Sequence, residues 1–326
     1  MATAAIDRGA TAKGAVRGVE RFAWGVVGYN VLVVLWGALV RATESGAGCG
    51  NNWPLCNGVA IPVSPTLHTI IEFTHRQMVT GDVIAVVGVL VWTFRASIKG
   101  AAARVFAVAS TLLLINEASL GALLVKLGYV TGNRSIGRVV VLSIHLSNTL
   151  LLLAALTLTA LMLGTRQMWA RLGGVRGRGF ALAGLLATVV VGVSGSLAAL
   201  GDTLFPAASL SAAMAQDFAT GSPWLLRVRW VHPASAVVAA LFVIWLVARA
   251  GWLRSQWVVG LLGFQFALGL ADILLLAPTW MQIVHLLGAD LYWIALVILT
   301  AGVVWSAVRD AEELPGTGGR DSSLIA

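Results

Sequence analysis

Long apolar stretches constrain this chain more than any other feature of its sequence. Each of eight stretches holds about 20 or more mostly apolar residues, which is enough to cross a bilayer as a helix. With 58% apolar and 11% charged residues, the chain departs from soluble domains, which average about 45–50% apolar and about 25% charged. This composition excludes a soluble domain and a disordered chain, and two cysteines exclude a disulfide scaffold.

We therefore predict an all-α polytopic membrane protein of eight transmembrane helices. No signal peptide is expected, because the first stretch can span and no small-residue cleavage site follows it. The predicted spans are Phe22 to Val40, Ile70 to Phe94, Val105 to Val125, Val139 to Leu163, Phe180 to Leu200, Leu226 to Val247, Trp257 to Leu276, and Met281 to Val308.

The basic residues, which give a net charge of +8, follow the membrane topology. With the N-terminus in the cytoplasm, 15 of the 22 Lys and Arg residues lie inside and 7 outside. This bias favours both termini inside, in the cell membrane, although Lys126, Arg134 and Arg138 between the third and fourth spans run against it. No basic patch is interleaved with aromatics, so membrane lipid and not nucleic acid is the expected surrounding partner.

The chain reads as two similar halves of four spans. Val284-His285-Leu286 resembles Ile144-His145-Leu146, and Gly195-Ser-Leu-Ala resembles Gly37-Ala-Leu-Val. Chance similarity among apolar helices is the alternative, but the matches keep their order, which favours a parallel repeat. We expect two pseudo-symmetric four-helix bundles. The predicted parts are a cytoplasmic segment 1-21, an N-terminal half 22-165, a cytoplasmic linker 166-179, a C-terminal half 180-308 and a cytoplasmic tail 309-326.

Four of the five histidines fall in the even-numbered spans, two in each half. They follow the predicted span starts by four to six residues, a depth of about 6–9 Å below the outer boundary. One such histidine can be a hydrogen-bonded packing residue, but four at one depth indicate metal or haem ligation. Zinc is disfavoured because the halves lack third and fourth ligands. The four histidines are His75, His145, His232 and His285; His68 lies in a loop.

A carboxylate distinguishes the first half. Glu72 precedes His75 by three residues, on the same helix face, whereas the sixth span has Arg229 at that offset. Glu72 could donate or accept a proton in a poorly solvated site. Alternatively, it only pairs with Arg76 at the i, i+4 spacing.

Both cysteines lie in the first outside loop, seven residues apart, as Cys49 and Cys56. A disulfide is reasonable on the oxidising side of the membrane, and its role is left open between a structural staple and a redox-active pair. The remaining intramembrane polar residues indicate hydrogen bonds between helices, with a proton path as the lesser alternative. These are Asp82, Glu117, Asn148, Gln265, Asp272 and Asp290.

At these residues the sequence resembles the haem A synthase family. The motifs are the segment from Gly37 to Cys49, Trp53-Pro-Leu-Cys56, and the segment from Leu67 to Arg76. The resemblance continues through the three later histidines and covers about Phe22 to about Val308.

This resemblance implies an enzyme that oxidises a ring methyl of haem O to the formyl group of haem A for terminal oxidases, by successive hydroxylations. It implies that His232 and His285 hold a haem b cofactor. The substrate haem O would then lie between His75 and His145, with Glu72 as the acidic catalytic residue. Haem O synthase and an electron donor are the expected partners, and a homo-oligomer is left open.

The sequence departs from the family pattern at two places. A second cysteine pair, which some members carry between the fifth and sixth spans, is absent from residues 201–224. Glu117 stands where its repeat partner Gln265 predicts an amide, so it either adds a protonatable group near the substrate site or is a tolerated exchange. Arginines outside, namely Arg41, Arg76 and Arg138, are candidates for contacts to haem propionates.

Two other functions compete with the synthase. A di-haem electron-transfer cytochrome b would bind permanent haem in both halves, and a haem carrier would bind haem without altering it. Neither function requires an acidic residue beside the histidine, so the presence of Glu72 in only one half favours the enzyme.

Overall fold

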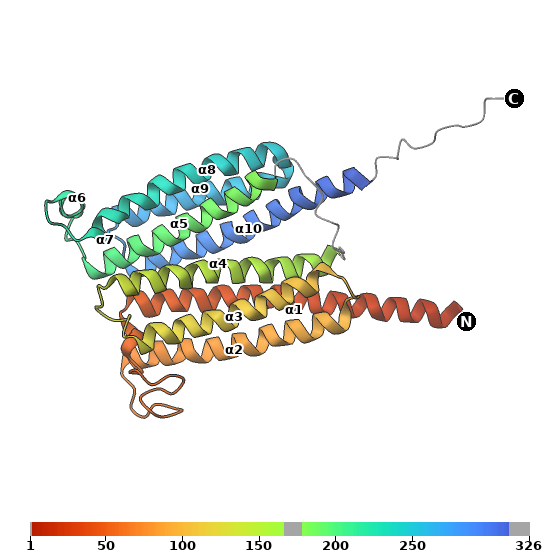
Figure 1. Cartoon of the computed structure of the whole chain (residues 1–326), viewed down its shortest axis with the longest axis horizontal. Helices are drawn as coiled ribbons and strands as arrows, with labels where there is room; N and C mark the ends of the chain where they lie inside the picture. Colours follow the sequence, from red (N-terminus) through yellow and green to blue (C-terminus); the bar gives the residue numbers. More distant parts are fainter. Residues whose placement is uncertain (1, 166–177, 313–326) are drawn as a thin grey trace.

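The computed structural model describes residues 2–165 and 178–312, and helices make up most of them (Figure 1). Across these residues the only β pairing is the isolated bridge between Cys56 and Val59. The eight long helices are α1 (Ala2–Ala42), α2 (Leu67–Ala96), α3 (Ala102–Lys126), α4 (Ile136–Thr165), α5 (Arg178–Leu204), α8 (Val231–Ala250), α9 (Trp252–Leu274) and α10 (Thr279–Glu312). The short ones are η1 (Ser45–Ala47), α6 (Leu210–Phe218), α7 (Trp224–Arg227) and η2 (Val228–Trp230).

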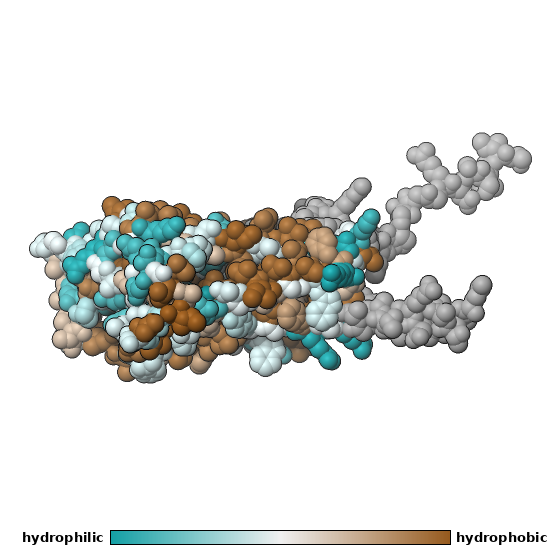
Figure 2. Space-filling model, turned by 90° about the horizontal axis from the view of Figure 1, so that it is seen from below, coloured by the Kyte–Doolittle hydropathy of each residue, from teal (hydrophilic) through white to brown (hydrophobic). Residues whose placement is uncertain are grey.

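The all-α fold with eight membrane-spanning helices is confirmed. Eight helical stretches are long and apolar enough to cross a membrane. The sixth combines α7, η2 and α8 into one span from Trp224 to Ala250. Exposed apolar side chains form a broad surface along the helices, and polar side chains gather toward the ends of the bundle (Figure 2). That distribution matches a molecule whose middle faces lipid.

Helix boundaries differ from the prediction by a few residues. The even-numbered spans begin two or three residues earlier than expected, because their first turns contain polar or capping residues that a hydropathy reading excludes. Thr66 caps α2 by accepting a hydrogen bond from the backbone N–H of Thr69 at 3.2 Å. Helix α6 was not predicted; Ser209 caps it in the same way.

The two halves lie side by side, with α1 to α4 in one and α5 to α10 in the other (Figure 1). Helices α1, α4, α5 and α10 each contact the other three, so they form the boundary between the halves. One apolar core crosses this boundary and includes Leu153, Leu156 and Leu296. The indole N–H of Trp293 in α10 donates to the carbonyl of Leu150 in α4 at 2.8 Å, and this bond is buried.

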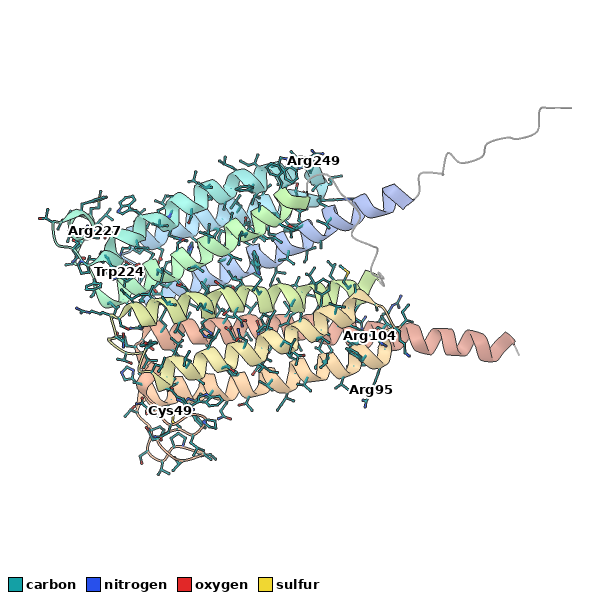
Figure 3. All side chains as sticks on the ribbon, viewed as in Figure 1. Cys49, Arg95, Arg104, Trp224, Arg227 and Arg249 are labelled. Atoms are coloured by element: carbon teal, nitrogen blue, oxygen red, sulfur yellow. A yellow bond between two sulfur atoms is a disulfide. The ribbon has the colours of Figure 1, made fainter. Side chains whose placement is uncertain are left out.

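The start of α1 and the end of α10 lie at the same end of the bundle (Figure 1). Arg95, Arg104 and Arg249 also lie at that end, whereas Cys49 and Arg227 lie at the opposite one (Figure 3). The molecule is therefore a multi-pass membrane protein with an even number of crossings. The predicted linker 166-179 and tail 309-326 fall largely outside the described residues, so the domain boundaries remain predictions.

Candidate functional site

The four histidines come from four different helices, two in each half. His75 lies in α2, His145 in α4, His232 in α8 and His285 in α10. Counted from the start of each span, they follow by six to nine residues, a depth of about 9–14 Å. The histidines therefore share one layer, as predicted, but this layer is deeper than expected because the helices begin earlier.

A glycine on the preceding span faces each histidine ring. A methyl group at Gly195 would lie 2.8 Å from Cε1 of His232, and one at Gly37 would lie 3.1 Å from Cε1 of His75. A side chain at these positions would push the imidazole out of place. The full set pairs Gly37 with His75, Gly121 with His145, Gly195 with His232, and Gly269 with His285. This fourfold pattern of glycine and histidine is the clearest trace of the internal repeat.

In the C-terminal half, the two imidazoles lie close together. The ring centroids of His232 and His285 lie 6.2 Å apart with an interplanar angle of 86°.

A hydrogen bond orients the ring of His232. Its Nδ1 lies 3.1 Å from the carbonyl of Val191, and a carbonyl can only accept. Nδ1 therefore carries the proton, which leaves the lone pair of Nε2 free to bind a metal. In His285, the amide nitrogen of Gln265 lies 3.2 Å from Nδ1 and donates to the backbone carbonyl of His285 at 3.0 Å.

In the N-terminal half, a carboxylate takes the place of that amide. Oε1 of Glu117 in α3 lies 3.2 Å from Nδ1 of His145. Nδ1 of His75 and Nδ1 of His145 are both buried without a hydrogen bond among the described residues, so the orientation of both rings depends on packing. Sequence reasoning offered Glu117 as a protonatable group near the substrate site or as a tolerated exchange, and the contact with His145 is visible only in the structure.

Glu72 is buried, with a residue exposure of 3%, and ties the outside loop to α2. Its Oε2 accepts the backbone N–H of Cys49 at 2.7 Å. Its Oε1 is paired with the guanidinium of Arg76, so the predicted i, i+4 ion pair is confirmed as a contact. Arg76 also donates to the carbonyls of Asn52 at 2.8 Å and Leu55 at 2.6 Å.

The predicted disulfide between Cys49 and Cys56 is confirmed, and both residues are buried. The loop that it closes sits against the start of α2, where the hydroxyl of Thr69 donates to the carbonyl of Gly48 at 2.9 Å. Only glycine fits at position 48, because a Cβ there would clash with the backbone of His68. The disulfide, the loop and Glu72 therefore form one packed unit above His75.

Arg41 lies in α1 but reaches into the other half. Nη1 donates to the carbonyl of Ala199 at 3.0 Å and to the hydroxyl of Thr203 at 3.1 Å, and Nη2 donates to Oε1 of Gln282 at 2.8 Å. These contacts could not be read from the sequence, because the partners are more than 150 positions away.

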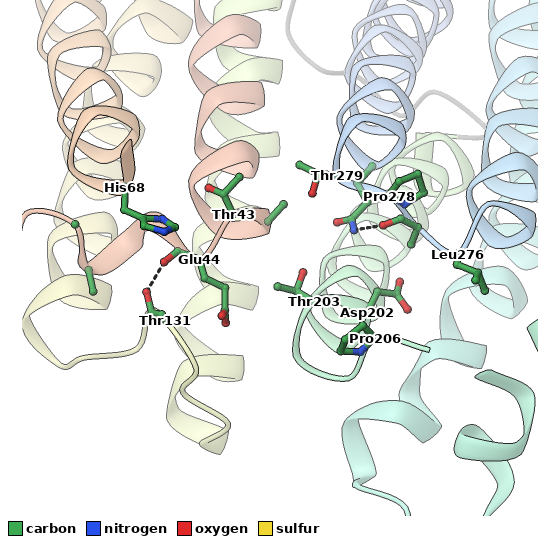
Figure 4. Close-up of a pocket in the computed structure, with 15 residues that line it drawn as sticks. Thr43, Glu44, His68, Thr131, Asp202, Thr203, Pro206, Leu276, Pro278 and Thr279 are labelled. Carbon is green, nitrogen blue, oxygen red and sulfur yellow. Dashed lines mark hydrogen bonds between the residues drawn. The ribbon is translucent and has the colours of Figure 1, made fainter. Parts of the chain in front are cut away.

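A cavity of about 680 Å³ opens between the halves at this end of the molecule (Figure 4). Glu44, His68 and Thr131 line it from the N-terminal half, and Asp202 and Thr203 from the C-terminal half. His68, whose Nδ1 lies 3.0 Å from the hydroxyl of Ser45, thus belongs to this cavity and not to the histidine layer. Sequence reasoning did not predict the cavity.

Comparison with known proteins agrees with this architecture. The family described as cytochrome oxidase assembly proteins matches residues 20–297. A protoheme IX farnesyltransferase of Thermus thermophilus is 41% identical over 306 residues, which cover 89% of this chain and 49% of that protein. The chain therefore spans about half the length of this relative.

Two further relatives match shorter segments. A haem A synthase of Halalkalibacterium halodurans is 44% identical over 93 residues, 28% of this chain and 31% of that protein. A haem A synthase of Lysinibacillus sphaericus is 53% identical over 66 residues, 20% of this chain and 21% of that protein. Because the family match extends over most of the eight-helix region, the chain belongs to the family of cytochrome oxidase assembly proteins.

Proposed function

We propose that this chain is a haem A synthase, which oxidises a ring methyl of haem O to a formyl group. The observation that carries the proposal is the asymmetry between two otherwise repeated sites. Both halves hold a pair of glycine-faced histidines, but only the first half adds a buried carboxylate, Glu72, one turn from a histidine. Two identical electron-transfer sites would not need this difference.

The C-terminal pair, His232 and His285, fits a resident haem, for which we propose haem b. These two imidazoles, whose ring centroids lie 6.2 Å apart, would hold the haem iron, since histidine is a usual haem ligand. Among the described residues, no three His, Cys, Asp or Glu side chains gather to hold a metal ion. The porphyrin would therefore complete the coordination. A bound haem of this kind supplies one-electron redox chemistry.

The N-terminal pair, His75 and His145, would hold the substrate haem O. Successive hydroxylations would convert the methyl carbon to an alcohol and then to a geminal diol, which loses water to give the formyl group. The net change inserts one oxygen atom and removes four electrons and four protons when water is the oxygen source, so an external electron acceptor is required in addition to the residues of this chain. Glu72 would accept or donate the proton at this side of the site. Its carboxylate is held in place by Cys49 and Arg76, so the group is positioned before substrate arrives.

The arginines would contribute to binding the propionates. Arg41 offers a guanidinium at the boundary between halves, whereas Arg76 already serves Glu72 and two loop carbonyls. We therefore expect Arg41 to contribute more than Arg76 to binding the propionates.

Haem O synthase is the partner that we propose for this chain, because an enzyme that makes farnesylated haem would supply the substrate. The relative named protoheme IX farnesyltransferase, which is about twice as long as the region that it shares with this chain, supports this partner. We also propose the cell membrane as the location, with both termini in the cytoplasm.

The test is to express the full chain with a source of haem O and identify the extracted haems by mass spectrometry. Haem A is expected from the wild-type protein, and strongly reduced haem A from Glu72→Gln and His75→Met. Asp82→Asn is the matched control, since Asp82 is a buried acid in the same helix that pairs with Asn30 at 2.7 Å. Haem O that stays bound but unchanged would indicate a carrier, and two permanent haems without conversion would indicate a cytochrome.

A further inference from the structure

The two halves differ in a polar network beside one histidine of each pair. In the N-terminal half, the carboxylate of Glu117 accepts a hydrogen bond from Nδ2 of Asn148 at 2.5 Å and another from the hydroxyl of Thr149. Asn148 is itself held by Asn116, whose Nδ2 donates to its Oδ1 at 2.8 Å. The carboxylate is therefore fixed in a position 3.2 Å from Nδ1 of His145.

The corresponding positions of the C-terminal half lack this network. Gln265 replaces Glu117, and the residues three and four places after His285 are Gly288 and Ala289, where the N-terminal half has Asn148 and Thr149. Phe264 stands in the place of Asn116. A Cβ at Gly288 would lie 2.5 Å from Oε1 of Gln265, so this glycine makes room for the amide. The exchange therefore involves several positions and not Glu117 alone.

A carboxylate and an amide affect a ligating imidazole differently. The carboxylate oxygen 3.2 Å from Nδ1 of His145 places a negative charge beside the ring, but these two atoms do not form a hydrogen bond. This negative charge raises the electron density that the imidazole offers to a metal. The neutral amide of Gln265 cannot do this, and its nitrogen, not its oxygen, faces His285.

We propose that Glu117 is a positioning residue that makes His145 a stronger electron donor to the iron of the haem bound in the N-terminal half. This proposal rests on the proposed function, because it takes His145 as a haem ligand. It assigns the two halves different electronic properties. We expect the haem iron of the carboxylate-backed site to have a lower reduction potential than the haem iron of the amide-backed site.

The experiment measures the reduction potentials of both haems in the full chain, purified in detergent and loaded with haem O. A spectroelectrochemical titration of the wild-type protein should give two steps, one of which disappears in His145→Ala and so marks the N-terminal site. Glu117→Gln keeps the shape of the side chain and removes its charge. This variant should raise the potential of the marked step, shift the ferric electron paramagnetic resonance signal of that haem, and leave the other haem unchanged.

A control variant separates this role from a merely structural one. Asn116→Ala removes the contact to Asn148 but leaves the two hydrogen bonds that hold the carboxylate directly, so it should leave both potentials close to their wild-type values. The proposal is overturned if Glu117→Gln moves neither potential, moves both equally, or matches Asn116→Ala. A wild-type protein that binds no haem in its N-terminal half overturns this proposal together with the proposed function. If haem binds in the N-terminal half and its reduction potential is unchanged in Glu117→Gln, only this proposal is overturned and the proposed function stands.

Discussion

The guanidinium of Arg41 in α1 and the side-chain oxygen of Gln282 in α10 lie 2.8 Å apart, across the boundary between the two halves. The same guanidinium bonds to Ala199 and Thr203 in α5. Arg41 therefore joins three helices just above the histidine layer. A side chain in this position couples the geometry of one site to the geometry of the other.

Replacing Arg41 by Gln should loosen the two halves. Hydrogen bonds to a charged group contribute about 1.5–3 kcal/mol each, and partial exposure reduces this, so a total loss of about 2–4 kcal/mol is expected. Thermal unfolding in detergent measures it. Arg95→Gln is the control, because Arg95 is an exposed arginine at the other end of the bundle. Equal melting temperatures for both variants would contradict the coupling.

Gly195→Ala should displace His232, because the new methyl group would lie 2.8 Å from Cε1 of the ring. We expect a large loss of bound haem, measured by the pyridine haemochrome assay. Alanine favours a helix by about 1 kcal/mol over glycine, so such a loss cannot come from helix propensity.

Gly121→Ala is the matched control for that prediction. Its methyl group would lie 3.9 Å from Cε1 of His145, an ordinary contact distance. Loaded with haem O, this variant should keep the haem of its N-terminal half, whereas Gly195→Ala should lose the haem of its C-terminal half, and this contrast tests the geometry. Equal haem contents in the two variants would show that the glycines do not set the ring positions.

Removing the disulfide with Cys49→Ser and Cys56→Ser together should destabilise the outside loop by about 2–3 kcal/mol, the loop-entropy value for so short a ring. The backbone N–H of Cys49 also holds Glu72, so haem A formation should fall in the same variant. Proteolysis of the loop and product analysis measure the two effects. A rigid loop with full product formation would indicate that the ion pair of Glu72 with Arg76 is sufficient.

Trp293→Phe should lower stability without altering the haem sites. It removes the buried hydrogen bond to the carbonyl of Leu150, which keeps its bond within α4, at a cost of about 0.5–1.5 kcal/mol. Denaturant or thermal unfolding, with haem absorbance recorded in parallel, checks both parts. A changed haem spectrum would place Trp293 in the site.

The disulfide and the Glu72–Arg76 pair could be predicted because their partners are seven and four residues apart. Residues this close in the chain can adopt only a few relative positions, so their spacing in the sequence is enough to predict the contact. The exchange of Glu117 for Gln265 was also visible in the repeat, but its meaning was not. That meaning depends on the contact with His145 in a neighbouring helix.

By itself, the sequence determined the class of this protein, its eight spans, its internal repeat and the layer of four histidines. Hydropathy and residue spacing describe positions along the chain. In a helix that crosses a bilayer, such a position also gives the depth of the residue in the membrane. Only the tertiary structure decided which groups meet across helices: the glycines that seat each imidazole, the reach of Arg41 into the other half, and the cavity between Glu44 and Asp202. These contacts depend on how helices rotate and pack against one another, and hydropathy leaves that rotation undetermined.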